Sequence, residues 1–93
     1  MSKLNSILHQ ELRLAIISFL ANVEKADFKK LMEITSASKG NLSVQISKLQ
    51  EAGYLEVIKS FKGNYPHTEC RITKQGKSEF ESYLKDLKQL LNL

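Results

Sequence analysis

Residues 38–55 read SKGNLSVQISKLQEAGYL, and this stretch decides the fold. Ser38 is a residue type that favours a helix N-cap, and Leu42, Ile46 and Leu49 follow it at the i, i+4, i+7 spacing of one narrow apolar stripe. Gly53 is the residue expected just past the end of such a helix. The stretch therefore predicts a helix that buries one face and exposes the other.

The chain before this stretch predicts two more helices. Apolar residues recur at helical spacing over a long first helix, roughly residues 3–22: Leu8, Leu12, Ala15, Ile16, Phe19 and Val23. Asp27 can cap a short second helix, in which Phe28, Leu31 and Ile34 face inward. The small residues 35–38 break that pattern and join the second helix to the third.

After Gly53 the apolar period changes from helical spacing to two. Residues 54–61 and 68–72 are predicted to be strands, and the turn-rich segment 62–67 joins them as a hairpin. Thr73 then caps a last helix with one apolar stripe: Phe80, Tyr83, Leu84, Leu87, Leu90 and Leu91. The fold class is mainly α with a small β-hairpin (α+β), in the order α-α-α-β-β-α, as one domain over residues 1–93.

Charge is unevenly distributed along the chain. The 93 residues carry a net charge of +4, and the basic balance fits either simple solubility or a polyanionic partner. Residues 38–74 hold six Lys or Arg against three Glu, so three of the four net charges fall on the third helix and the hairpin. This concentration favours a polyanionic partner for that segment.

No targeting or membrane signal is recognisable. The single cysteine, Cys70, cannot form an internal disulfide, and the first 20 residues include charged and polar side chains that do not suit a secretory signal. The longest apolar stretch, residues 14–21, is far short of the roughly 20 residues of a membrane span. We expect a cytoplasmic protein that does not associate with a membrane.

Two short helices joined by a few small polar residues have the layout of a helix-turn-helix. Helical spacing puts Gly40, Val44 and Ser47 opposite the buried stripe, flanked by Asn41, Ser43 and Lys48, and this outer face shows no acidic side chain. Such a face can read base edges in a major groove, and the alternative is an ordinary solvated helix. The predicted base-reading residues are Asn41, Ser43, Val44 and Ser47.

The hairpin that follows this helix is basic. Lys59 and Lys62 precede its tip, and His67 and Arg71 follow it. A basic hairpin beside a recognition helix can lie along phosphates or enter the minor groove. The predicted contacts with a DNA backbone are Ser38, Lys39, Lys48, Lys59, Lys62 and Arg71.

Two segments resemble a known family. Residues 38–43 with 48–55, and residues 66–76 at the junction with the last helix, are similar to winged helix-turn-helix transcriptional regulators, in particular the small single-domain prokaryotic type related to the MarR and ArsR groups. The resemblance covers residues 26 to about 90. It implies a winged-helix fold, sequence-specific binding of double-stranded DNA, and usually a homodimer.

The sequence departs from the family pattern at several positions. Gln45 stands where relatives often have a histidine, and Cys70 stands where an aromatic is common. Tyr65 and His67 flank the proline where basic residues are common. These differences mean that a target sequence cannot be carried over from relatives.

Other chemistry is poorly supported by the sequence. His67 and Cys70 stand three residues apart, but a metal site needs about four ligands and only His9 adds another imidazole. Cys70 shares strand parity with Ile72 and is expected to be a small buried side chain. We expect no metal, no cofactor and no enzymatic activity.

The last helix also predicts a dimer. Phe80, Leu84, Leu87 and Leu91 have nearly the spacing of a coiled-coil seam, and the first helix has a second apolar strip at Leu4, Ile7, Leu14 and Ile17. We expect these two sets, within residues 1–22 and 74–93, to form a homodimer interface; the alternative is that the last helix docks on its own domain.

The leading interpretation is a homodimeric regulator, a repressor that acts by occlusion. The alternative is a winged helix that binds a partner protein without sequence-specific DNA binding. An operator, the regulated genes and an effector ligand cannot be read from the sequence.

Overall fold

The computed structural model describes residues 4–93. Its elements follow the order α-β-α-α-β-β-α. They are α1 (Glu11–Leu20), β1 (Ala26–Asp27), α2 (Phe28–Thr35), α3 (Lys39–Glu51), β2 (Leu55–Lys62), β3 (Tyr65–Ile72) and α4 (Lys74–Leu91).

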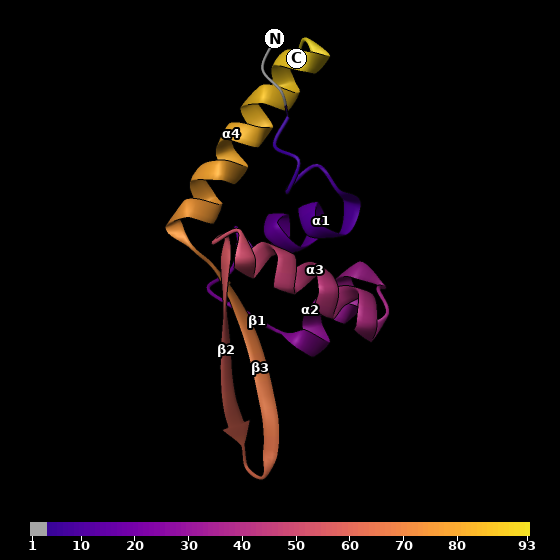
Figure 1. The fold of residues 1–93 in the computed structure, drawn as a ribbon, viewed down its shortest axis with the longest axis vertical. Coiled ribbons are helices and arrows are strands. Elements are labelled where there is room, and N and C mark those ends of the chain that lie inside the picture. Colours follow the sequence, from indigo (N-terminus) through magenta and orange to yellow (C-terminus); the bar gives the residue numbers. More distant parts are fainter. Residues whose placement is uncertain (1–3) are drawn as a thin grey trace.

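The molecule is elongated, with extents of 51 × 25 × 21 Å. Helices α1, α2 and α3 pack together beside the upper part of the sheet, and the β2–β3 hairpin extends beyond them (Figure 1). Helix α4 rises from the opposite end of the sheet and passes α1 (Figure 1). The hairpin and the far half of α4 therefore project from a common helical body.

The first helix is shorter than the sequence predicts. Residue 3, where the predicted helix begins, lies outside the described residues, and the described segment 4–10 forms turns rather than helix. The Asn5 side chain accepts hydrogen bonds from the backbone N–H groups of Ile7 and Leu8, which closes a local turn. Gln10 then has an extended backbone and caps α1 through its side chain. Two side-chain-to-backbone caps thus replace the predicted first turns of the helix.

The second and third helices begin where the sequence predicts. Asp27 accepts from the N–H of Lys30, and Ser38 accepts from the N–H of Asn41, so both predicted N-caps are confirmed. The predicted inward stripe of α3 is also confirmed, with Leu42, Ile46 and Leu49 buried. The prediction for α2 is partly wrong.

Leu31 is the buried residue of α2, Phe28 is only half-buried, and Ile34 is 39% exposed. Ile34 occupies the last turn of this short helix, one residue before its end at Thr35. The exposed fraction of Val23 in the first predicted stripe is likewise 36%, because α1 ends before it.

The sheet has one strand more than the sequence predicts. β1 pairs antiparallel with β3, and β3 pairs antiparallel with β2, which gives the order β1-β3-β2. The hairpin strands also run further than predicted, because Tyr65, Pro66 and His67 belong to β3. The turn is reduced to Gly63 and Asn64, and Gly63 has a φ of +68°, the left-handed value that a type II′ turn requires at its first central position.

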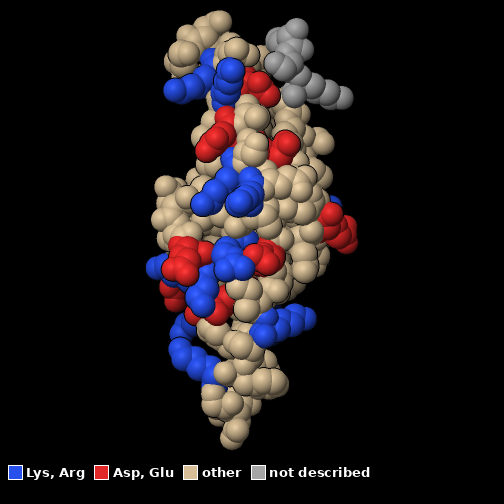
Figure 2. All heavy atoms as spheres, turned by 90° about the vertical axis from the view of Figure 1, so that its left-hand side faces the viewer, with Lys and Arg blue, Asp and Glu red and all other residues tan. Residues whose placement is uncertain are grey.

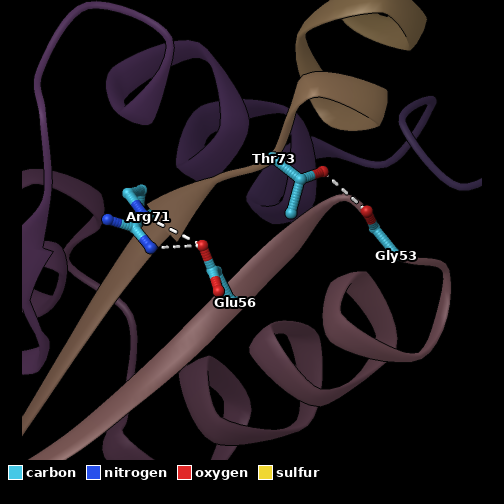
Figure 3. Close-up of polar contacts among 4 residues, drawn as sticks. All are labelled: Gly53, Glu56, Arg71 and Thr73. Atoms are coloured by element: carbon cyan, nitrogen blue, oxygen red, sulfur yellow. Dashed lines mark hydrogen bonds and ion pairs between the residues drawn. The ribbon is translucent and has the colours of Figure 1, made fainter.

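The start of α4 is fixed to the end of α3 by close backbone packing. The Thr73 hydroxyl donates to the carbonyl oxygen of Gly53 at 2.6 Å (Figure 3) and accepts from the N–H of Gly76 at 2.9 Å, so the predicted cap is confirmed. A Cβ on Gly76 would lie 2.1 Å from the carbonyl oxygen of Tyr54. This contact lets α4 begin directly on the sheet.

Helix α4 is only partly covered by its own domain. Tyr83 is buried, and its hydroxyl lies 2.8 Å from Nδ1 of His9. Phe80 and Leu87 pack against the core, whereas Leu84, Leu90 and Leu91 are exposed. No helix within residues 4–93 is long and apolar enough to cross a membrane.

Candidate nucleic-acid interface

A groove runs between the helical body and the hairpin. It is lined by residues of α2, α3, β2 and β3, and most of its charged side chains are lysines. Its lining includes four lysines and two serines: Lys29, Lys39, Lys59, Lys62, Ser43 and Ser47. The single carboxylate in the lining is that of Asp27, which caps α2.

The predicted base-reading residues of α3 all lie on the surface. Asn41, Ser43, Val44 and Ser47 are exposed. Ser43 and Ser47 face the groove, while Val44 lies further around the helix, away from the core. The side chains nearest the hairpin are therefore small and polar.

The outer face of α3 contains one acidic side chain, whereas the sequence predicts none. The helix continues to Glu51, which is exposed and follows Ser47 and Val44 at i+4 and i+7. The acid-free surface is thus limited to the first three turns. Glu51 sits at the C-terminal end of the helix, and recognition helices use their N-terminal residues for base contacts.

The N-terminus of α3 is open on the surface. Ser38, Lys39 and Gly40 are exposed, and the first turn contains no acidic residue. The Oγ of Ser38 accepts the N–H of Asn41, which leaves its hydroxyl proton available to donate. The free N–H groups of this end and the helix dipole together favour a phosphate.

The predicted basic residues separate into two groups. Lys39, Lys59 and Lys62 line the groove, and Lys29 of α2 joins them without having been predicted. Lys48 is exposed in the last turn of α3 outside the groove lining, where a cation is stabilised by the helix dipole.

Arg71 does not belong to this basic group. Its guanidinium binds Oε1 of Glu56 through Nε at 2.9 Å and Nη2 at 2.6 Å (Figure 3). The two residues are cross-strand partners, and they lie on the hairpin face opposite that of buried Cys70. The neighbouring Glu69 shares this outer face and pairs with Lys25 and His67. Arg71 is therefore paired within the sheet and is not among the residues that line the groove.

Gln45 is a site residue whose role the sequence analysis missed. Its side chain is buried, with 9% exposed, and Nη1 of Arg13 in α1 donates to its Oε1. Its Nε2 donates to Oδ1 of Asn41 at 3.1 Å. The pair Arg13 and Gln45 is separated by 32 positions, so no local sequence pattern could reveal the contact.

Two exposed aromatic side chains lie close to the tip of the hairpin, on either side of the Gly63–Asn64 turn. Phe61 is 76% exposed and Tyr65 is 77% exposed. Figure 2 shows the extreme end of the hairpin without charged atoms and Lys or Arg side chains flanking it closer to the body. The hairpin therefore presents lysines along its length and two exposed rings close to its tip, next to Lys62.

His67 and Cys70 do not converge on a common site. Cys70 is fully buried in the core, as predicted, and burial raises the pKa of its thiol from 9.0 to about 11. His67 points to the other face of β3, where its Nε2 lies 3.7 Å from Glu69.

The predicted dimer residues differ in their exposure. Ile17 is fully buried inside the single chain, so it has no surface left for a partner. Leu4, Ile7, Leu14, Phe80 and Leu87 are half-buried, and Leu84 and Leu91 are exposed. Leu84, Leu87, Leu91 and Leu93 line one shallow apolar surface at the far end of α4.

Residues 12–91 match a family described as winged helix DNA-binding domain. An uncharacterised protein of Methanocaldococcus jannaschii is 31% identical over 84 residues, which cover 90% of this chain and 91% of that protein.

Structures of transcriptional regulators are among the solved structures that are similar to this chain. A transcriptional regulator homologue from Pyrococcus horikoshii has a TM-score of 0.86 at 30% identity, covering 92% of this chain and 85% of that one. PadR of Bacillus subtilis, in a complex with operator DNA, has a TM-score of 0.72 at 17% identity, covering 81% of this chain and 48% of that one. The second likeness concerns the fold alone.

Proposed function

The chain belongs to the family of winged helix DNA-binding domains, and from this premise we propose that it is a sequence-specific regulator of transcription that binds double-stranded DNA. The observation that carries the proposal is the groove between α3 and the hairpin, in which small polar side chains of α3 share the lining with four lysines: Lys29, Lys39, Lys59 and Lys62. The Pyrococcus protein, which is 30% identical to this chain, is a transcriptional regulator homologue. The PadR structure contains operator DNA.

In the proposed complex α3 lies in the major groove. Its exposed N-terminal half presents Asn41 and Ser43 to base edges, and Ser47 and Val44 lie one turn further along. Val44 is the apolar side chain in this set and suits the methyl group of thymine. Small residues at positions 40, 43 and 47 allow the helix to approach the bases closely.

The phosphates are held from three elements. The N-terminus of α3 with Ser38 and Lys39 binds one phosphate, Lys29 of α2 lies at the same groove, and Lys59 and Lys62 of the hairpin lie along the backbone. The rings of Phe61 and Tyr65, which lie beside Lys62 near the end of the hairpin, contact the sugar edge of the minor groove. We leave Arg71 out of this set because Glu56 neutralises it.

We also propose that two copies assemble through α4. The exposed surface of Leu84, Leu87, Leu91 and Leu93 is apolar, and charged side chains rim it at Glu81, Lys85 and Lys88. A second copy related by a two-fold axis would cover this surface with an identical one. The dimer would place two recognition helices about 34–36 Å apart and read a roughly palindromic site.

We further propose that the protein represses transcription by occlusion, because α3 and the hairpin would cover the DNA that they bind. The test is selection of bound duplexes from a random pool, followed by affinity measurements at several salt concentrations. A recovered two-fold sequence bound with strong salt dependence would support the proposal. Equal affinity for selected and random duplexes would contradict it.

A further inference from the structure

Three side chains form a chain of hydrogen bonds from the domain interior to the outer face of α3. Arg13 of α1 donates through Nε to the carbonyl oxygen of Ile7 at 2.6 Å and through Nη1 to Oε1 of Gln45. Gln45 donates through Nε2 to Oδ1 of Asn41 at 3.1 Å. Arg13 is half-buried, Gln45 is buried, and Asn41 is exposed.

The direction of this chain is fixed at its inner end. An arginine side chain has five N–H donors and no acceptor, so the atom of Gln45 that faces Arg13 must be its oxygen. The Gln45 amide group then faces Asn41 with its nitrogen, which is a donor. The atom of Asn41 that faces Gln45 must therefore be its oxygen, and its Nδ2 is left on the exposed side.

The backbone holds the same residue in place. The N–H of Asn41 is bound by the Ser38 cap, so Asn41 sits in the ordered first turn of α3. Because one end of its side chain is bound to Gln45, Asn41 cannot exchange its oxygen and nitrogen without breaking that bond. An unconstrained asparagine presents either a donor or an acceptor, whereas this one presents donors.

We infer that Arg13, acting through Gln45, is a positioning residue that makes Asn41 present N–H donors to the DNA, and so selects a base that offers acceptors. Guanine, with O6 and N7 in the major groove, fits this requirement, and cytosine, with its N4 donor, does not. The inference rests on the proposed function. It adds a residue of the first helix to the determinants of base preference.

The direct test of orientation uses the free protein. Exchange of side-chain amide protons with solvent, measured by ¹⁵N NMR, should be slow for Gln45, whose N–H is bonded, and fast for Asn41. In Gln45→Glu, the new carboxylate accepts from Arg13 and has only acceptor oxygens left for Asn41, so the Asn41 amide must turn and donate inward. We expect its exchange to slow about tenfold in this variant. Exchange that is already slow for Asn41 in the wild-type protein would overturn the inference.

The test of base preference uses selected duplexes. At the base pair whose preference disappears in Asn41→Ala, the wild-type protein should favour guanine over cytosine by roughly tenfold. Gln45→Glu should reverse this preference, because Asn41 then presents its oxygen outward. Gln45→Met keeps the length of the side chain and removes the amide, so its affinities for the guanine and cytosine duplexes should agree within about twofold. This variant also tests the inference if Gln45→Glu does not fold.

The two tests separate the inference from the function that it rests on. An unchanged guanine preference in either Gln45 variant would overturn the positioning role while leaving the proposed function intact. A wild-type protein that selects no duplex would contradict the proposed function, and the exchange measurement would still decide how Asn41 is oriented.

Discussion

Arg71 places its guanidinium on Oε1 of Glu56, directly across the hairpin, at 2.6 Å. This pair lies on the face of the sheet turned away from the buried core, whereas Lys59 and Lys62 line the groove beside α3. The two kinds of basic residue on one hairpin therefore have different partners.

Replacing Lys59 or Lys62 with alanine should weaken binding to every duplex and lower the slope of log K against log salt by roughly 0.9 for each lost phosphate contact. Arg71→Ala is the matched control on the same hairpin and should leave the slope unchanged. Fluorescence anisotropy over a range of salt concentrations measures both. A decrease of the salt slope in Arg71→Ala, with no decrease in the lysine variants, would refute the assignment of the phosphate contacts to Lys59 and Lys62.

The exposed rings at the tip should contribute to affinity without contributing to the fold. Phe61→Ala removes a ring that is 76% exposed, so we expect the melting temperature to stay within about 2 °C, because exposed substitutions change stability by less than about 0.5 kcal/mol. Affinity for the selected duplex should fall by about five- to tenfold. Phe61→Tyr, which keeps the ring, should retain wild-type affinity. Equal binding by the alanine variant and the wild-type protein would remove the tip from the interface.

The junction of α4 with the sheet should be intolerant of any side chain. A Cβ at Gly76 would lie 2.1 Å from the carbonyl oxygen of Tyr54, so Gly76→Ala should lower the free energy of unfolding by about 3 kcal/mol. The matched control is Gly40→Ala in α3, where no atom lies within 4 Å of the added Cβ. That change should raise stability by about 0.5 kcal/mol, because alanine favours a helix over glycine. Urea denaturation measures the free energy of unfolding of each variant. Similar changes in the two variants would contradict the close packing of Gly76 against the Tyr54 carbonyl group.

The α4 surface should control assembly. Leu84→Glu with Leu91→Glu should convert a dimer into a monomer, because burying two carboxylates in an apolar interface is unfavourable. Leu90→Glu, on the same helix but outside this surface, should leave the dimer intact. Sedimentation gives the mass in each case. A wild-type chain that sediments as a monomer at micromolar concentration would contradict the dimer.

The thiol of Cys70 should be inert in the folded protein. Its pKa is raised from 9.0 to about 11 by burial, which lowers the thiolate fraction about a hundredfold at neutral pH. The folded state favours the neutral thiol, so this contribution to stability is complete below pH 9 and is lost as the pH rises through about 11. Alkylation followed by mass spectrometry should be at least a hundredfold slower than in urea-unfolded protein. Comparable rates in the two states would contradict the burial of the thiol.

Much of the fold can be predicted because its signals are local. Ser38, Leu42 and Gly53 mark the start, the buried face and the end of α3 within one short stretch, and the structure confirms all three. The winged-helix resemblance is confirmed by the family match and the observed topology.

The errors arise where local and tertiary signals disagree. The apolar spacing of residues 7 and 8 with the helix that follows suggests a helix, but Asn5 and Gln10 cap backbone N–H groups and interrupt it. The two-residue strand β1 is too short for any alternation to be visible and exists only because β3 is its neighbour.

The sequence predicts one part of the candidate site and misses another. Exposed residues of α3 follow from helical spacing, so Asn41, Ser43, Val44 and Ser47 were placed on the surface correctly. Which lysines share a groove depends on how the hairpin lies relative to α2. This tertiary arrangement adds Lys29 to the lining, and the sequence does not predict it. The role of Gln45 depends on a contact with Arg13, which only the folded chain brings near.

The central claim is that the surface of α3 and the hairpin reads a DNA sequence. The most direct measurement is the affinity ratio between the duplex selected from a random pool and a scrambled duplex of the same length at about 150 mM salt. We expect a ratio of at least 10³ in favour of the selected sequence, together with a steep loss of affinity for both duplexes as salt rises. Equal affinity for the two duplexes, or no salt-sensitive binding to either at about 50 mM salt, would contradict it.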